Sequence, residues 1–203
     1  MTAEDEQRRL WNRAAGAYDR AMQPLERRWL GPERTRLLAR ARGRTLEAGI
    51  GTGVNLPLYP DTVELTGVDS SPAMLAVAGR RASELGRAAD LRLGVADSLD
   101  EADAALDTVV ATLLLCSVPD VARTLGEFAR VLRPGGRLLL LDHVESSWAP
   151  VRGAQRLADA MTAHTGECWR RRPLLTLAAS GFVVEDVRAS RGRLVEAVVA
   201  RRA

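Results

Sequence analysis

The stretch that decides the fold is Leu46-Glu47-Ala48-Gly49-Ile50-Gly51-Thr52-Gly53. It begins as a short apolar run, which is typical of a buried strand, and it ends in three glycines at alternate positions. Glycines permit a tight turn and let a ligand approach the backbone closely. The exposed N–H groups of such a loop suit a polar ligand. The same glycines also serve to pack a strand against a helix, so the neighbouring segments have to decide between the two uses.

Acidic residues end the next two predicted strands. Asp69 closes residues 63–70 (VELTGVDS), 22 residues after Glu47, and Asp97 closes residues 90–97 (DLRLGVAD). An acid about 20 residues after a glycine loop accepts hydrogen bonds from ribose hydroxyls. Because the carboxyl ends of parallel strands meet at one edge of a sheet, these acids point to a ligand site at that edge.

Strands and helices alternate through the middle of the chain. The predicted strands are 44–49, 63–70, 90–97, 107–118 and 137–146, and helices are expected at 72–86 and 119–136. This alternation predicts a parallel sheet that is covered by helices on both faces. Two further strands near the C-terminus are separated by the short turn Ser190-Arg191-Gly192, so they should be antiparallel.

The length of 203 residues fits a single domain. Within it we expect a helical cap at residues 1–42, interrupted at Pro24, and a ligand-binding core at 43–147. An insertion or lid should follow at 148–169. A helix and the antiparallel strand pair should complete the domain at 170–203.

Five motifs occur in order: LEAGIGTG (46–53), GVDSS (67–71), GVADS (94–98), RVLRPGG (130–136) and the two-strand ending. In this combination the chain resembles the class I S-adenosylmethionine (SAM)-dependent methyltransferases, over about residues 44–145. The resemblance implies an α/β fold with a Rossmann-like, seven-stranded, mostly parallel sheet. The implied strand order is 3-2-1-4-5-7-6, with strand 7 antiparallel and helices on both faces.

The resemblance also implies a SAM site. Gly49, Gly51 and Gly53 would hold the methionine end of the cofactor, with Glu47 supporting its ammonium group, and Asp69 would bind the ribose hydroxyls. The other implied contacts are Ser70, Met74, Asp97 and Ser98 near the nucleoside, and Leu115 and Cys116 beside the methionine. NAD is the rival cofactor, but this loop has GxGxG rather than the GxGxxG of dinucleotide sites.

Other segments narrow the resemblance to one branch. LEAGIGTGVNLPLYP, LCSVPD, the pair Asp142-His143 and the element GECW resemble quinone C-methyltransferases, bacterial phosphatidylethanolamine N-methyltransferases and thiol S-methyltransferases, and the thiol group most. Asp142 stands where this branch more often has Glu. The implied partner is a small-molecule acceptor, best a thiol sulfur. A phospholipid amine or a quinone precursor is the alternative, and a SAM-binding regulator without methyl transfer is a distant one.

His143 and Tyr18 are the candidate catalytic residues. His143 follows the fifth predicted strand at the site edge, and Tyr18 lies on the N-terminal helix, which in this branch often closes over the site. Pairing with Asp142 or aromatic packing would explain the two residues equally well. The two cysteines and two histidines lie at scattered spacings that match no zinc pattern, so we expect no metal.

Composition excludes several classes of protein. All 29 basic residues are arginine, which excludes a Walker A loop and a lysine Schiff base. A net charge of +3 and the lack of an Asn-Pro-Pro-Tyr motif argue against a nucleic-acid partner. No apolar run approaches the ~18 residues of a membrane span, and no signal peptide is visible, so we expect a cytoplasmic protein. The cluster Arg170-Arg171-Arg172 should be a solvated helix face, and nothing in the sequence indicates an oligomeric state.

Overall fold

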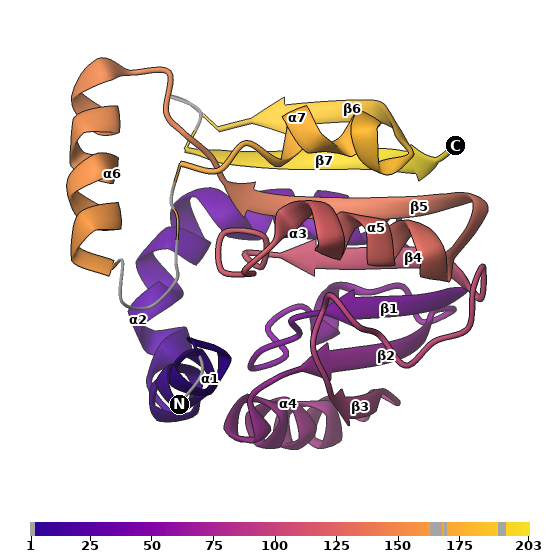
Figure 1. Ribbon diagram of the computed structural model, residues 1–203. Helices are drawn as coiled ribbons and strands as arrows, with labels where there is room; N and C mark the ends of the chain where they lie inside the picture. Colours follow the sequence, from indigo (N-terminus) through magenta and orange to yellow (C-terminus); the bar gives the residue numbers. More distant parts are fainter. Residues whose placement is uncertain (1–2, 163–167, 169, 191–193) are drawn as a thin grey trace.

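A seven-stranded sheet forms the centre of the protein, in a computed structural model that describes residues 3–162, 168, 170–190 and 194–203 (Figure 1). The strands are β1 (Arg44–Ala48), β2 (Glu64–Asp69), β3 (Asp90–Leu93), β4 (Leu106–Thr112), β5 (Leu132–His143), β6 (Phe182–Ala189) and β7 (Val195–Arg202). Their order is β3-β2-β1-β4-β5-β7-β6, and β7 runs antiparallel to both of its neighbours. The predicted fold class and strand order are therefore confirmed.

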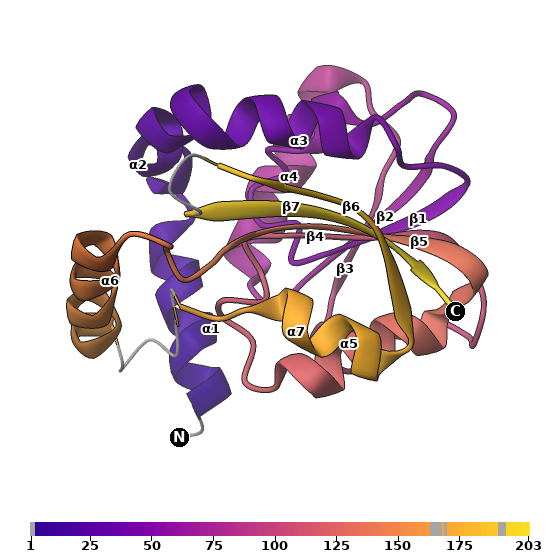
Figure 2. The ribbon, with the colours of Figure 1, turned by 90° about the horizontal axis from the view of Figure 1, so that it is seen from above.

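Helices cover both faces of the sheet, as Figure 2 shows. They are α1 (Ala3–Ala14), α2 (Tyr18–Leu25), the π-helix η1 (Glu26–Leu30), α3 (Gly31–Leu38), α4 (Pro72–Leu85), α5 (Val121–Val131), α6 (Ala149–Thr162) and α7 (Pro173–Leu177), with short 3-10 turns η2 (Leu56–Leu58) and η4 (Ala178–Ser180). Of the described helices, none is both long enough and apolar enough to span a bilayer.

Alternation along β5 divides the interior into two cores. Leu138 and Leu140 face α5 and α7, whereas Leu139 and Leu141 face α3 and α4. All four side chains are at most 2% exposed. Because side chains of a strand point alternately to opposite faces, this continuous leucine run packs both helix layers onto the sheet.

The apolar run at 107–118 is longer than the strand that it forms. β4 ends at Thr112, and Leu113 takes the left-handed conformation with φ +54°. A bulky residue in that conformation leaves the extended ladder, so residues 113–118 form a loop at the carboxyl edge instead of more strand. The predicted strand boundary was wrong at this end.

Pro24 does not interrupt the N-terminal helices as predicted. It lies inside α2, and the break falls at residues 15–17, around Gly16. The π-helix that follows Pro24 widens the turn, which helps the chain to accommodate a residue that has no N–H to donate.

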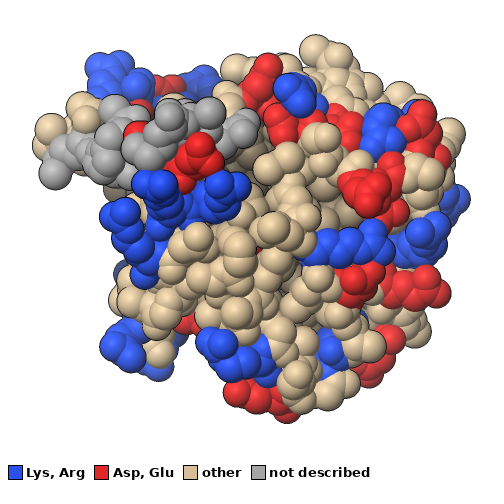
Figure 3. Space-filling view, turned by 60° about the horizontal axis from the view of Figure 1, so that its bottom comes forward, with Lys and Arg blue, Asp and Glu red and all other residues tan. Residues whose placement is uncertain are grey.

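The three arginines at 170–172 do not form a solvated helix face. They precede α7, and each binds a partner: Arg170 pairs with Asp159 and Arg172 with Glu145. Arg171 donates to the backbone carbonyls of Leu115 and Val118, at 2.6 Å for the former. On the right of the face seen in Figure 3 basic and acidic residues are interspersed, whereas several basic residues lie together on the left.

Candidate active site

An open pocket of about 170 Å³ lies at the carboxyl edge of the parallel strands. The glycine loop after β1, the turn after β2, the segment after β3 and the loop after β4 all contribute to its wall, and α1 and α2 cover it. Of the predicted site residues, seven line it: Tyr18, Gly49, Gly51, Asp69, Ser70, Met74 and Asp97. The other six, Glu47, Gly53, Ser98, Leu115, Cys116 and His143, do not line this pocket.

The three glycines of the loop have positive φ angles but different surroundings. A Cβ on Gly51 would meet nothing within 4 Å, so this residue opens directly onto the pocket. A Cβ on Gly49 would lie 2.7 Å from Leu114, and one on Gly53 would lie 2.7 Å from Leu56. Gly51 therefore leaves room for a ligand, whereas Gly53 permits close packing behind the loop.

Asp69 ties the glycine loop to the end of β2. Its carboxylate accepts hydrogen bonds from the backbone N–H groups of Gly51 at 2.8 Å and Ser71 at 2.9 Å. Burial raises the pKa of Asp69, and the backbone hydrogen bonds act in the opposite direction. The predicted ribose-binding acid is thus oriented at the pocket wall before any ligand binds.

Glu47 lies beneath the glycine loop and is 1% exposed. Its carboxylate accepts hydrogen bonds from Asn55 and, at 2.8 Å, from the hydroxyl of Tyr59. Burial raises the pKa of Glu47 to about 7, although these hydrogen bonds and the charge of Arg34 act in the opposite direction. A carboxyl with this pKa changes its charge within the physiological range.

Two predicted adenine contacts lie apart. Asp97 lines the pocket and forms an ion pair with Arg123 at 3.3 Å. Ser98 is exposed outside the pocket, and its backbone N–H bonds to the carbonyl of Val95. Ser70 and Met74 line the pocket at the turn after β2, where Ser71 caps α4.

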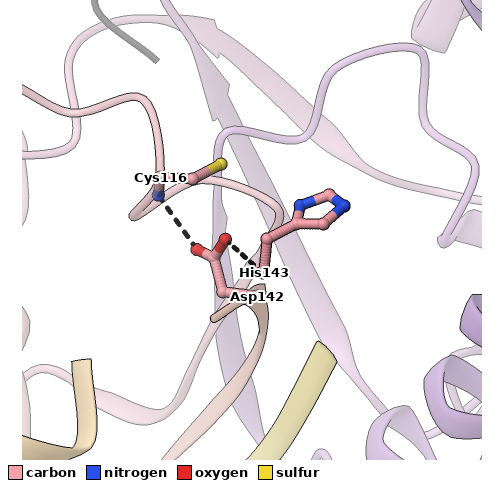
Figure 4. Close-up of side chains that lie close together, drawn as sticks. All are labelled: Cys116, Asp142 and His143. Atoms are coloured by element: carbon pink, nitrogen blue, oxygen red, sulfur yellow. Dashed lines mark hydrogen bonds between the residues drawn. The ribbon is translucent and has the colours of Figure 1, made fainter. Parts of the chain in front are cut away.

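The loop after β4 presents other residues than those predicted. Leu113, Leu114 and Ser117 line the pocket, whereas Leu115 is fully buried in the core behind it. Cys116 does not line the pocket; its thiol donates to the carbonyl of Leu113 at 3.5 Å, and its backbone N–H donates to Asp142 at 3.2 Å (Figure 4). The chain pattern indicated the loop but not which of its side chains turn inward.

The two candidate catalytic residues occupy different positions. Tyr18 lines the pocket and packs edge-on against Trp11, with ring centroids 6.0 Å apart. His143 stands behind the pocket, and burial lowers the pKa of its imidazole to about 4, with a smaller contribution from the charge of Arg34. His143 is therefore a neutral imidazole near pH 7.

Arg34 lines the pocket but was not among the site residues predicted from the sequence. It lies on α3 and is 3% exposed. It pairs with Glu26 at 2.9 Å and donates to Asn55 at 3.0 Å and Thr112 at 2.7 Å. A signal was present, because Arg34 lies on the apolar face of its helix, four residues after Leu30. Burying a cation in that position costs free energy unless the cation is paired with an anion or binds a ligand.

The N-terminal helices also supply polar contacts that the sequence did not reveal. Gln7 donates to the carbonyl of Ser117 at 2.6 Å. The Asn12 side chain accepts from Ser71 at 2.7 Å, and Asp19 accepts from Thr52 at 2.6 Å. These bonds reach three different loops of the site edge, so α1 and α2 hold together the mouth of the pocket.

Comparison with known proteins shows which family this chain resembles. A sequence model described as a methyltransferase domain matches residues 46–140, and curated methyltransferases match over about half of the chain. Over residues 46–140 the chain is therefore similar to the class I SAM-dependent methyltransferases. A phosphatidylethanolamine N-methyltransferase of Cereibacter sphaeroides is 40% identical over 116 residues, which cover 56% of this chain and 57% of that protein.

Two further relatives come from the same branch. Thiol S-methyltransferase TMT1B of Homo sapiens is 39% identical over 110 residues, which cover 51% of this chain and 45% of that protein. A demethylmenaquinone methyltransferase of Beutenbergia cavernae is 34% identical over 127 residues, which cover 62% and 51%. The chain spans about half the length of the curated relatives that it matches.

Solved methyltransferase structures share the fold along the whole chain. Geranyl diphosphate C-methyltransferase from Streptomyces coelicolor, solved with S-adenosyl-L-homocysteine, superposes with a TM-score of 0.77 at 17% identity and covers 100% of this chain and 99% of that one. A possible histamine N-methyltransferase from Thermotoga maritima gives 0.75 at 18% identity, with 97% and 100% covered.

The residues at the pocket fit SAM, the cofactor of the class I methyltransferases that this chain resembles. Gly51 leaves open space over a backbone that a ligand can approach, and Asp69 presents a carboxylate at the end of β2. Met74 and Val95 line the same pocket as Asp97 and give it the apolar surface that a flat nucleobase requires.

Proposed function

We propose that this protein transfers the methyl group of SAM to a small-molecule acceptor, with a thiol sulfur as the preferred acceptor atom. The observation that carries the choice of acceptor is the buried Arg34 in the pocket wall. The described lining residues include two arginines, Arg8 and Arg34, two acids, Asp69 and Asp97, and no histidine, and of the two arginines only Arg34 is buried. A thiol is the acceptor class that gains most from a nearby cation and least needs a base.

SAM supplies an electrophilic methyl group, so the protein has to bind, align and dehydrate the reactants. In this proposal Glu47, Gly49 and Gly51 hold the methionine end, while Asp69 and Ser70 bind the ribose. The other proposed cofactor residues are Gly53, Met74, Asp97, Ser98, Leu115 and Cys116. Those of them that do not line the pocket act by shaping its walls.

Arg34 gives the acceptor site its proposed specificity. The thiolate rather than the thiol is the nucleophile, and an opposite charge nearby lowers a thiol pKa below its usual ~8.5. Its guanidinium is buried and fixed by Glu26 and Thr112, so it cannot swing away into solvent. A protonated amine would be repelled by the same group.

Proton removal then needs little help from the protein. Tyr18 lines the pocket and would orient the acceptor, with Trp11 holding its ring. His143, the second candidate catalytic residue, does not line the pocket, so in this proposal the thiol proton leaves to solvent. Burial lowers the pKa of its imidazole to about 4, which makes it too weak a base to take a proton from a thiol.

A phospholipid amine is the second candidate acceptor. It is favoured by the 40% identity to the phosphatidylethanolamine N-methyltransferase of Cereibacter sphaeroides. A quinone precursor is the third, from the match to a demethylmenaquinone methyltransferase. Turnover limited to lipid vesicles or to quinone precursors would favour these candidates over a thiol.

The role of Arg34 can be tested by the pH dependence of kcat with a soluble thiol, since kcat reports groups in the bound complex. Removing the charge in Arg34→Gln should move the acidic limb of the profile upward by about one pH unit or more. Arg34→Lys should restore much of the shift. Circular dichroism checks that both variants fold, and an unmoved limb in folded Arg34→Gln would remove Arg34 from this role.

A further inference from the structure

Cys116, Asp142 and His143 form a side-chain cluster that the proposed methyl transfer does not fully use. They lie at the ends of β4 and β5, 26 residues apart in sequence for the first two, beside the loop that lines the pocket. A thiol sulfur, a carboxylate oxygen and an imidazole nitrogen all come within 4.8 Å of one another. Figure 4 shows the three groups turned toward a shared space.

Asp142 is buried, at 4% exposure, and forms no ion pair among the described residues. Its oxygens accept backbone hydrogen bonds from Cys116 at 3.2 Å and His143 at 2.8 Å. Buried carboxylates in proteins are usually paired with a cation or bound to a metal. The chain has 29 arginines, yet none of those that the structure describes forms an ion pair with Asp142. A cation of another kind could therefore bind this buried carboxylate.

The distances suit a small metal ion. Three atoms that lie within 4.8 Å of one another share a point at most about 2.8 Å from each, whereas zinc requires about 2.0–2.3 Å. Each ligand atom would therefore have to move by less than about 1 Å. The backbone hydrogen bonds to Asp142 already orient the carboxylate, as outer contacts do in metal sites.

We propose that Cys116, Asp142 and His143 bind one zinc-type divalent cation beside the cofactor pocket. One sulfur, one oxygen and one imidazole nitrogen form a ligand set of the mixed softness that Zn²⁺ prefers over Mg²⁺ or Ca²⁺. Three protein ligands leave a fourth position for water or an incoming ligand. On binding, the Cys116 thiol loses its proton to solvent and the thiolate bonds to the metal. The expectation of no metal rested on linear spacing, which does not show that the ends of β4 and β5 meet.

The test is zinc binding by tag-free full-length protein after removal of metals with a chelator, measured by equilibrium dialysis and elemental analysis. We expect one Zn²⁺ per chain. Cys116→Ser and His143→Gln should each weaken binding by more than about tenfold. Co²⁺ in place of Zn²⁺ should give a thiolate-to-metal absorption band that is lost in Cys116→Ser.

The chain supplies matched controls, because it has one other cysteine and one other histidine. Cys168→Ser and His164→Gln should bind zinc as the unchanged protein does. No stoichiometric zinc, or equal loss in the control variants, would overturn the proposal. Binding is measured without SAM or acceptor, so failure of the metal site and failure of the proposed methyl transfer remain distinguishable.

Discussion

The residues of the glycine loop have different structural roles, although they form one motif in the sequence. Gly51 opens onto the pocket, Gly53 allows close packing on Leu56, and Glu47 is hydrogen-bonded beneath them. Of these three residues, only Gly51 borders open space that a ligand can occupy. The distinction between ligand binding and packing can be tested residue by residue.

Gly51→Val should abolish SAM binding, because the side chain would fill space that the ligand needs. Gly86→Val is the matched control, since Gly86 has a similar φ of +62° and equally open surroundings at the end of α4, away from the pocket. Both variants should lose stability by about 1–3 kcal/mol from backbone strain. Calorimetric titration with SAM should then show binding in Gly86→Val alone. A folded Gly51→Val with normal affinity would place the methionine end elsewhere.

Glu47 should make stability depend on pH. The unfolded chain releases this proton near the ordinary pKa of 4.5, and the folded protein near pH 7. The folded state therefore holds more protons between these values, and the free energy of unfolding falls as the pH rises through that window. The contribution is about 3 kcal/mol.

Urea unfolding of the unchanged protein and of Glu47→Gln at pH 5 and pH 8 isolates this contribution. Other groups titrate equally in both proteins, so the difference between the two pH dependences belongs to Glu47. Between these pH values the unchanged protein should lose more stability than the variant does. Identical pH dependence in the two proteins would mean that Glu47 is ionised at pH 5 in the folded state.

At the scale of elements, the loop after β4 is held by contacts from distant segments. Arg171 binds the carbonyls of Leu115 and Val118, Gln7 binds that of Ser117, and Asp142 accepts from Cys116. Hydrogen bonds from three separate segments make this loop rigid enough to form part of a binding pocket.

Arg171→Ala should destabilise the protein by about 1.5–3 kcal/mol, because it leaves two carbonyls without a charged donor. Its neighbour provides the control: Arg172 pairs with Glu145 but is 55% exposed, so Arg172→Ala should cost about 0–1 kcal/mol. Thermal unfolding of the two variants compares the costs directly. Equal losses would show that the Arg171 contacts contribute no more than a surface ion pair.

The elements that the sequence predicted are those with local signals. The glycine loop and Asp69 follow apolar runs and lie at the strand ends as predicted, whereas β3 ends at Leu93, four residues before Asp97, so the predicted end of that strand was wrong. The end of β4 could not be predicted in this way. The apolar run continues through Leu113, and only the backbone conformation at that residue ends the strand. Apolar pattern shows what is buried, but not where a buried chain leaves the sheet.

The contacts made by the N-terminal helices could not be predicted from the sequence, for a different reason. Asn12, Asp19 and Gln7 are ordinary polar residues of an amphipathic helix until the helix docks on the loops. Their partners are from 33 to 110 residues away along the chain. Arg34 is the exception, since a charge on an apolar helix face signals a buried role by itself.

At the scale of the whole molecule, the sheet, the cap and the late insertion meet at one edge. Figure 1 shows α1, α2 and α6 beside the ends of the parallel strands, with the C-terminus at the far side. The strand edge presents the groups proposed for SAM, and α1 to α3 supply Trp11, Tyr18 and Arg34 around the same pocket. Cofactor and acceptor would thus be held by different parts of the fold.

The most direct test of this account is release of S-adenosylhomocysteine from SAM in the presence of separate acceptors. The panel should contain soluble thiols, amines, phenols, quinone precursors and phosphatidylethanolamine vesicles. We expect turnover with thiols, at rates that rise as the thiol ionises. Turnover with vesicles or quinone precursors alone would contradict the thiol assignment, and tight SAM binding with no turnover on any acceptor would contradict methyl transfer itself.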